Sequence, residues 1–154
     1  MKLISACLCG FRCKYHGGHN LVDECLDLLS SGNVIPVCPE QLGGLPTPRS
    51  SCEIRGGSGA DVLSGHARVF SKDGQDVTEY FVRGAQEVLK MAQILNINEA
   101  ILKSRSPSCG AGVIYDGSFS GCLIAGDGVT SALLKANGIK ITDELEFISA
   151  KDVK

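Results

Sequence analysis

Short apolar runs alternate with helical patterns along this chain, and this alternation limits the fold more than any other feature. Four runs have the length and apolar content of buried strands: 3–6, 34–37, 99–103 and 139–141. Three stretches carry apolar residues at helical spacing: 21–31, 78–95 and 129–137. Strands that alternate with helices predict a parallel sheet with right-handed crossovers. We therefore predict an α/β fold: a single three-layer domain over residues 1–154, with a small Rossmann-like or flavodoxin-like parallel sheet flanked by helices.

The ends of the helices and the connections between elements also carry signals. Asn20, Asp76 or Thr78, and Asp127 are expected to cap the starts of the three helices. The stretch 39–59, rich in proline and paired glycines, is too long for a simple connection and is expected to be a functional loop. A small β-hairpin insertion is predicted around 67–74, and a second hairpin or paired loop around 112–124.

Charge and hydropathy exclude several classes of partner. The net charge of −2 offers no basic surface for nucleic acid or for a membrane. No apolar run approaches the ~20 residues that cross a bilayer, and the first residues lack the apolar core of a signal peptide. We expect a cytoplasmic protein with reduced cysteines that acts on a small molecule. A homo-oligomer is compatible with the sequence.

Three of the eight cysteines follow predicted strands. Cys7 and Cys38 come directly after the runs 3–6 and 34–37, and Cys109 follows the run 99–103 within a Ser-Pro-Ser-Cys-Gly loop. The carboxyl ends of parallel strands meet at one edge, where open α/β sheets bind their ligands. The sequence therefore predicts that these three thiols converge on a metal or cluster site with one position left for substrate.

The other five cysteines have different contexts. Cys25 lies on the apolar face of the first predicted helix, and Cys122 precedes a short apolar run, so both are interpreted as core residues. Cys52, in the polar loop, is left unassigned. Cys9 and Cys13 share the first loop with Cys7, and either could supply a fourth ligand.

Ligand chemistry leaves two kinds of site open. Thiolates select zinc, copper(I) or iron–sulfur clusters. His16 and His19 lie near the first cysteine loop, so a zinc site with three cysteines and one histidine fits the sequence. A cubane cluster held by three cysteines fits it equally well. There is no Cys-x-x-Cys motif that would decide between them.

Several motifs together resemble one bacterial family. They are Ser5-Ala6-Cys7-Leu8-x-Gly10, Pro36-Val37-Cys38-Pro39-Glu40, Gly43-Gly44-Leu45-Pro46-Thr47-Pro48-Arg49 and Lys103-x-Arg105-Ser106-Pro107-Ser108-Cys109-Gly110. The family is a domain-of-unknown-function family related to thiouracil desulfidase, and the resemblance spans residues 3 to 142. It implies a [4Fe-4S] cluster held by three cysteines. Two departures are Lys14-Tyr15-His16-Gly17, where the family often has Arg-Tyr-Asp-Gly, and the extra thiol of Cys9.

The resemblance also implies roles for individual residues. It places the cluster on Cys7, Cys38 and Cys109, the catalytic carboxylate on Glu40 and the catalytic serine on Ser106. Arg49, Ser108 and Tyr15 are the candidate substrate-binding residues. Each role has a plainer alternative: Glu40 could orient a ligand or cap a helix, Ser106 could brace its turn, and Arg49 could be a solvated loop residue.

These assignments lead to a functional hypothesis. We expect a cluster-dependent desulfidase that removes sulfur from a small thiolated heterocycle, such as a thiouracil, by replacing sulfur with water and without net electron transfer. The alternative is a non-catalytic iron–sulfur or zinc binding module, such as a sulfide carrier or a redox sensor. A mononuclear zinc hydrolase is a third reading.

Overall fold

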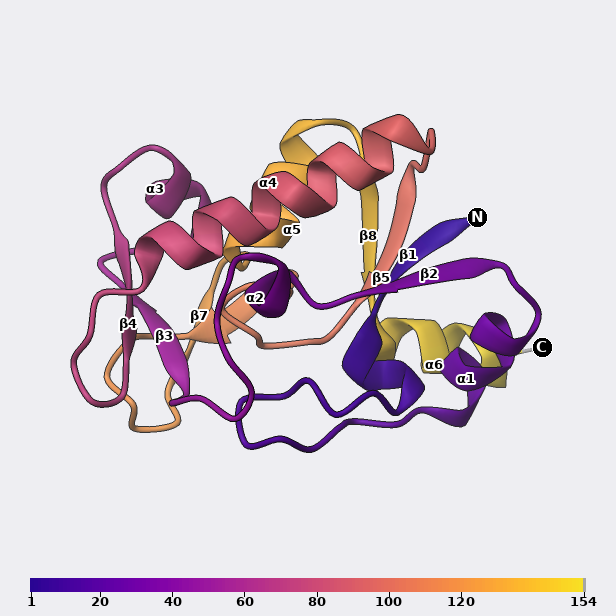
Figure 1. Cartoon of the computed structure of the whole chain (residues 1–154), viewed down its shortest axis with the longest axis horizontal. Coiled ribbons are helices and arrows are strands. Elements are labelled where there is room, and N and C mark those ends of the chain that lie inside the picture. Colours follow the sequence, from indigo (N-terminus) through magenta and orange to yellow (C-terminus); the bar gives the residue numbers. More distant parts are fainter. Residues whose placement is uncertain (154) are drawn as a thin grey trace.

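Four parallel strands form the central sheet of the computed structural model, which describes residues 1–153 (Figure 1). The strands lie in the order β2-β1-β5-β8 and have these bounds: β1 Lys2–Ser5, β2 Val34–Val37, β5 Glu99–Leu102 and β8 Lys140–Asp143. In the centre, Leu3 pairs with Ile35 on one side and with Ala100 on the other. The predicted parallel sheet is confirmed.

Helices cover both faces of the sheet. On one face, Leu3 and Leu102 pack with side chains of α4 (Thr78–Ile94) and α5 (Val129–Ala136). On the other face, Ile4 and Ile101 pack toward α1 (Asp23–Ser30) and α6 (Glu144–Asp152). Successive residues of a strand point to opposite faces, so neighbouring apolar residues are needed where both faces are covered. This requirement explains why the strands read as continuous apolar runs.

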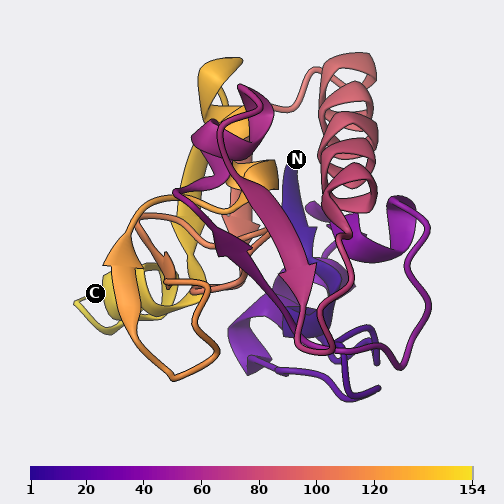
Figure 2. The same ribbon diagram turned by 90° about the vertical axis from the view of Figure 1, so that its left-hand side faces the viewer.

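Two antiparallel hairpins lie beyond the carboxyl end of the sheet (Figure 2). The first pairs β3 (Cys52–Arg55) with β4 (Arg68–Ser71), and the second pairs β6 (Val113–Tyr115) with β7 (Leu123–Ala125). A separate apolar cluster joins the hairpins to α4 and α5; it includes Ile54, Val69, Phe81, Ile114 and Val129. The hairpins are therefore fixed to the helices rather than projecting freely. Three short helices complete the chain: η1 Ala6–Cys9, α2 Pro39–Leu42 and α3 Gly59–Leu63.

The short helix α2 packs directly on the backbone of α4. A methyl group on Gly43 would lie 2.0 Å from the carbonyl oxygen of Tyr80, and one on Gly84 would lie 2.0 Å from that of Pro39. Only glycine fits at two positions this close to a neighbouring backbone. The contact fixes α2, and with it Glu40, against the longest helix of the protein.

The predicted loop 39–59 is wrong in part. It contains α2 and β3, and the strand predicted at 67–70 pairs with β3. Sequence reasoning missed β3, although Cys52–Arg55 alternates between apolar and polar residues, because this short run lies between a proline-rich stretch and the pair Gly56-Gly57. Beyond the turn at 72–74, Phe70 still forms the predicted return contact, an isolated bridge to Asp76.

Two of the predicted helix caps are also wrong. The first helix starts at Asp23 after Val22, and Asn20 hydrogen-bonds elsewhere. The Asp127 carboxylate caps no helix: it accepts hydrogen bonds from the Gly112 backbone N–H and from Lys135. Asp76 does accept a hydrogen bond from the first N–H of α4, that of Thr78. Within residues 1–153, no helix has the length and apolar character that crossing a membrane requires.

Candidate active site

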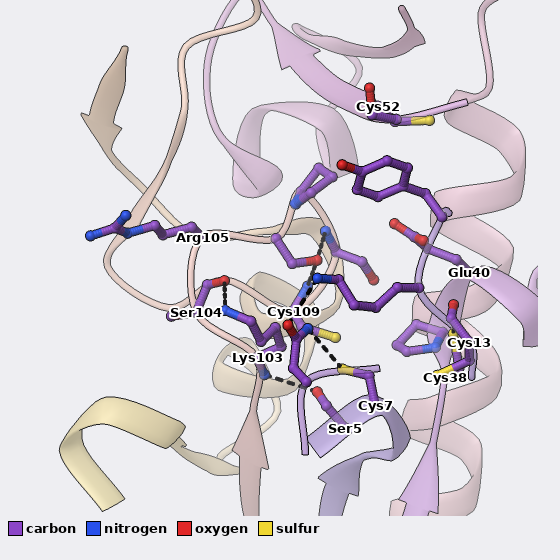
Figure 3. A pocket seen from close by; sticks show the side chains of 18 of the residues that line it. Ser5, Cys7, Cys13, Cys38, Glu40, Cys52, Lys103, Ser104, Arg105 and Cys109 are labelled. Carbon is purple, nitrogen blue, oxygen red and sulfur yellow. Dashed lines mark hydrogen bonds between the residues drawn. The ribbon is translucent and has the colours of Figure 1, made fainter. Parts of the chain in front are cut away.

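A cavity of about 690 Å³ opens at the carboxyl edge of the sheet (Figure 3). All four strands contribute to its wall just past their ends: Cys7 after β1, Cys38 after β2, Lys103 to Cys109 after β5, and Glu144 after β8. The chain runs from β1 to β2, which lies on one side of β1, while β5 lies on the other side, so the strand order reverses direction at β1. A ligand site in a parallel sheet is expected at such a reversal.

The three predicted thiols, Cys7, Cys38 and Cys109, all line this cavity. Cys13 joins them from the loop after η1, and Figure 3 shows it beside Cys38. The Cys38 thiol donates a hydrogen bond to the carbonyl of Cys13 at 3.8 Å. The structure therefore gathers four cysteines from three segments that are distant in the sequence.

The environment changes how readily these thiols ionise. The hydrogen bond from Cys13 lowers the pKa of Cys38 to about 7, against the opposing effect of burial. The same partner lowers the pKa of Cys7, and the amide of Asn20 lies 3.8 Å from the Cys7 sulfur and acts in the same direction. Burial raises the pKa of Cys109, although Ser5 donates a hydrogen bond to its sulfur. Thiolates are the form that binds metals.

Glu40 and Arg49 form an ion pair on the cavity wall. The guanidinium holds a single carboxylate oxygen, Oε2, through Nε at 2.9 Å and through Nη2. Among residues 1–153, nothing donates a hydrogen bond to the other oxygen, Oε1. Glu40 therefore has one anchored oxygen and one that can receive a proton or bind water.

Arg49 has no N–H group left for a substrate. Its Nη1 donates to the carbonyl of Pro46 (3.2 Å) and to the hydroxyl of Thr47 (2.8 Å), and its Nη2 also donates to the carbonyl of Cys13 (2.8 Å). Together with the two bonds to Glu40, all five guanidinium donors are engaged. This geometry corrects the predicted substrate contact: Arg49 orients Glu40 and holds the cysteine loop.

The two candidate serines are also held by the protein. The Ser106 hydroxyl accepts N–H groups from Ser108 (3.1 Å) and Cys109 (3.0 Å), which is the bracing role of a turn serine. Its own O–H proton is still able to point into the cavity. The Ser108 hydroxyl is buried and bonds to the hydroxyl of Thr130 at 2.8 Å, so the predicted substrate contact of Ser108 is not made by its hydroxyl.

Tyr15 lies on the cavity wall with 44% of its surface exposed, where it can reach a ligand. Its carbonyl accepts the backbone N–H of Arg49 (2.7 Å), so the Lys14-Tyr15-His16-Gly17 segment is tied to the loop that carries the ion pair. The histidines considered for zinc bond locally: His16 Nδ1 accepts the N–H of Gly18, and His19 Nδ1 accepts that of Leu21.

Sequence reasoning missed a second ion pair at the cavity. Lys103 Nζ lies 2.7 Å from Glu144 Oε1, and Ser104 donates to the same carboxylate through its N–H (2.6 Å) and its hydroxyl (2.8 Å). Burial alone would raise the pKa of Glu144, but the hydrogen bonds from Lys103 and Ser104 lower it overall. Lys103 lies within one of the motifs that resemble the family. Glu144 carries no local sequence signal, because its place at the cavity depends on β8 lying next to β5 in the sheet.

The remaining cysteines separate into two groups. Cys25 is fully buried among apolar side chains, as predicted, and Cys9 is buried beside it and donates to the Cys25 carbonyl. The prediction for Cys122 is wrong: it is exposed, because it precedes a strand whose residues all face solvent. Cys52 lines the cavity on the β3 side, away from the cysteine group in Figure 3, and burial raises its pKa to about 12.

The donor set can be tested against the two predicted kinds of metal centre. A single zinc ion needs all its sulfur ligands within ~2.3 Å of one point. Among residues 1–153, no three His, Cys, Asp or Glu side chains are grouped in a way that could hold one metal ion. An iron–sulfur cluster takes each thiolate on a different iron, so its ligands need not all lie within bonding distance of one point. Thiols spread around one cavity therefore fit a cluster.

Comparison with known proteins gives the family. The sequence model of the 2-thiouracil desulfurase family matches residues 3–146. The chain belongs to this family. Among curated proteins, the uncharacterized protein YbbK of Bacillus subtilis (strain 168) is 46% identical over 147 residues, which cover 96% of this chain and 97% of the relative.

A solved structure shows the same fold. The [4Fe-4S]-dependent thiouracil desulfidase TudS superposes with a TM-score of 0.83 at 39% identity, over 99% of this chain and 98% of that one. The family assignment that the motifs suggested is therefore confirmed, and so is the α/β fold with a parallel sheet flanked by helices.

Proposed function

We propose that this protein is a [4Fe-4S]-dependent desulfidase that replaces the sulfur of a small thiolated heterocycle with oxygen from water. The observation that carries the proposal is the convergence of Cys7, Cys38 and Cys109, each from a different parallel strand, on one cavity beside Glu40. Membership of the 2-thiouracil desulfurase family and the likeness to TudS support it.

The cavity walls divide the tasks of such a reaction. Cys7, Cys38 and Cys109 would hold the cluster, which supplies an iron with a soft, open coordination position for the sulfur of the substrate. The cavity volume of about 690 Å³ lies in the range of small-molecule sites and accommodates a single heterocycle with room for water. Tyr15 lies where its ring can contact that heterocycle.

Glu40 is the candidate general base. Arg49 fixes its Oε2, and Oε1, which accepts no hydrogen bond within residues 1–153, can accept a proton from the attacking water. Ser106 supports the turn that presents Cys109 and can donate its hydroxyl proton to a polar atom of the substrate. Sulfur leaves as sulfide and oxygen enters from water, so the exchange needs no external electron donor.

The test begins with anaerobically prepared protein, reconstituted with iron and sulfide. We expect about four irons and four acid-labile sulfides per chain, and release of sulfide with formation of uracil from 2-thiouracil. Cys7→Ser, Cys38→Ser and Cys109→Ser should each lose iron, because a hydroxyl is a poor cluster ligand. Cys25→Ser and Cys122→Ser are the matched controls and should keep it.

Three outcomes contradict the proposal. A loaded cluster without turnover on any thiolated heterocycle would favour a non-catalytic iron–sulfur module. Stoichiometric zinc in place of iron would favour a zinc module. Equal loss of iron from all five variants would show a folding defect and would remove the assignment of the ligands.

A further inference from the structure

The cavity reaches beyond the cysteine group to the two hairpins, and no residue at that end has a role in the proposed reaction. Its wall there includes Cys52 and Glu53 of β3, Tyr115 of β6, and Phe119 of the turn between β6 and β7. Figure 3 shows Cys52 on the side away from the group around Cys38. A heterocycle whose sulfur lies at the cysteines therefore extends its ring toward the hairpins.

Phe119 has a backbone conformation that a phenylalanine rarely adopts. Its φ angle is 55°, in the left-handed region. In that region the Cβ atom lies close to the following carbonyl oxygen, so glycine or asparagine is the usual residue at such a turn position. A bulky side chain that is kept there against this cost points to a function of the side chain itself.

Contacts with β3 hold the turn that carries Phe119. The Oε1 atom of Glu53 accepts the backbone N–H groups of Gly117 (3.0 Å) and Phe119 (3.2 Å). Arg55 donates from Nε to the carbonyl of Gly117 at 3.2 Å. A methyl group on Gly117 would lie 2.5 Å from the carbonyl oxygen of Ile54, so the turn lies directly on the strand. The backbone that presents the Phe119 ring is thus fixed before a ligand binds, which lowers the entropy cost of binding.

Arg55 also contacts a second phenylalanine, which provides a comparison. Its guanidinium carbon lies 4.9 Å from the ring centre of Phe70 and 5.9 Å from that of Phe119, and both distances are typical of a cation–π contact. In the described part of the chain, the cavity wall includes Phe119 and not Phe70. The two rings therefore share a structural partner, but only the ring of Phe119 is available to a ligand in the cavity.

We propose that Phe119 is a specificity-determining residue that contacts the substrate and recognises a flat, unsaturated ring by packing against it. This inference rests on the proposed function, since it names the part of that cavity that selects the ring. Aromatic side chains pack on the π face of any nucleobase-like ring, with little regard to its substituents. A ring with a saturated C5–C6 bond keeps the same polar groups but loses planarity and part of its π system, so it should bind less well.

The first experiment compares uracil with 5,6-dihydrouracil, which have the same polar groups and no sulfur. Their binding to the anaerobically reconstituted protein is measured by equilibrium dialysis. The wild type should bind uracil about 2–12-fold more tightly, the range expected for an aromatic pair beyond its buried area. Phe119→Leu should lose this difference, and Phe119→Tyr should keep it. Phe70→Leu is the matched control and should also keep it, because Phe70 lies outside the cavity wall.

The second experiment uses turnover of 2-thiouracil. Phe119→Leu should raise KM about 2–12-fold and leave iron content and kcat per cluster unchanged, because the ring contact is made equally in the ground state and the transition state. A fall in kcat per cluster with KM unchanged would overturn the inference, since Phe119 would then act on the chemical step.

The dialysis result separates this inference from the proposed function, because uracil and 5,6-dihydrouracil need neither turnover nor an iron–sulfur bond. The inference is overturned if the wild type binds neither ring or binds both equally, or if Phe119→Leu still prefers uracil. It is also overturned if Phe70→Leu loses the preference as fully as Phe119→Leu does, since packing of the hairpins would then explain it. A preference for uracil that disappears in Phe119→Leu alone supports the inference, even where the wild type releases no sulfide and the proposed function fails.

Discussion

Two carboxylate–cation pairs line the same cavity, and they differ in how much of each carboxylate the protein occupies. Glu40 pairs with Arg49 just past β2, and Glu144 pairs with Lys103 just past β8 and β5. The Glu144 side chain is 7% exposed, and both of its oxygens accept hydrogen bonds from Ser104 or Lys103. The Glu40 side chain is 16% exposed, and only its Oε2 is engaged.

The cations of the two pairs also differ in which other groups they bind. Lys103 uses its ammonium group on Glu144 and on the carbonyl and hydroxyl of Ser104, which ties β5 to the start of α6. Arg49 uses its donors on Glu40 and on the loops that carry Cys13 and Thr47. A carboxylate whose acceptors are saturated can only stabilise structure. One that keeps an oxygen open in a fixed orientation can handle a proton.

The largest expected effect is that of Glu40→Gln. The amide keeps the shape of the side chain and an acceptor for Arg49 but cannot act as a base. Sulfide release per bound cluster should fall ~10²–10⁴-fold, with iron content unchanged. Normal activity per cluster in this variant would show that Glu40, like Glu144, only stabilises the structure. That result would contradict the proposed difference between the two ion pairs.

Arg49→Lys should have the next largest effect. Lysine offers a point charge without the planar fork of five donors, so it cannot hold Glu40, Pro46, Thr47 and Cys13 together. Turnover per cluster should fall ~10–100-fold because Glu40 loses its orientation. The affinity for substrate should change little, since Arg49 has no donor left for it. A selective rise in KM would show instead that Arg49 binds substrate.

Glu144→Gln should act on stability and leave the chemistry intact. Removing one partner of a buried ion pair costs ~3–5 kcal/mol, and partial exposure of Lys103 reduces this to about 2–4 kcal/mol here. For a domain of this size the melting temperature should fall by about 4–16 °C. Thermal unfolding measures this change, and a large loss of turnover per cluster at a temperature where the variant is folded would contradict the assignment.

The smallest effect concerns the pH dependence of the Glu144 contribution. The hydrogen bonds from Lys103 and Ser104 hold the pKa of Glu144 in the folded protein below the ordinary value of 4.5 for a glutamate, so folding favours the ionised form. The stabilisation is therefore present above pH 4.5 and lost as pH falls through the folded-state value. The difference in unfolding free energy between the wild type and Glu144→Gln should be constant from neutral pH down to about 5 and shrink below 4.5. A difference that grows in acid would contradict this sign.

Sequence reasoning singled out Glu40 as a site residue and missed Glu144, for a physical reason. Glu40 lies two residues from Cys38, so a local motif marks both as parts of one site. Glu144 reaches the cavity because β8 pairs with β5, a contact between segments about 40 residues apart. Strand order within the sheet depends on packing between distant segments, and no spacing rule encodes it.

The same distinction explains the other outcomes. The sheet and its long helices follow from apolar periodicity, which is local, and they were predicted correctly. The convergence of Cys7, Cys38 and Cys109 follows from their positions after parallel strands. The saturation of Arg49 and the burial of the Ser108 hydroxyl depend on side-chain contacts across the cavity, which only the folded chain defines.

One measurement tests the central claim most directly: a crystal structure of the anaerobically reconstituted protein with a thiolated pyrimidine bound, with iron located by anomalous scattering. We predict iron bonded to the sulfurs of Cys7, Cys38 and Cys109, the sulfur of the ligand at the remaining iron, and Oε1 of Glu40 facing the carbon that carries that sulfur. Glu144 should still be enclosed by Ser104 and Lys103. Iron held by Cys13 in place of Cys109, or a ligand that faces Glu144 and not Glu40, would contradict the account.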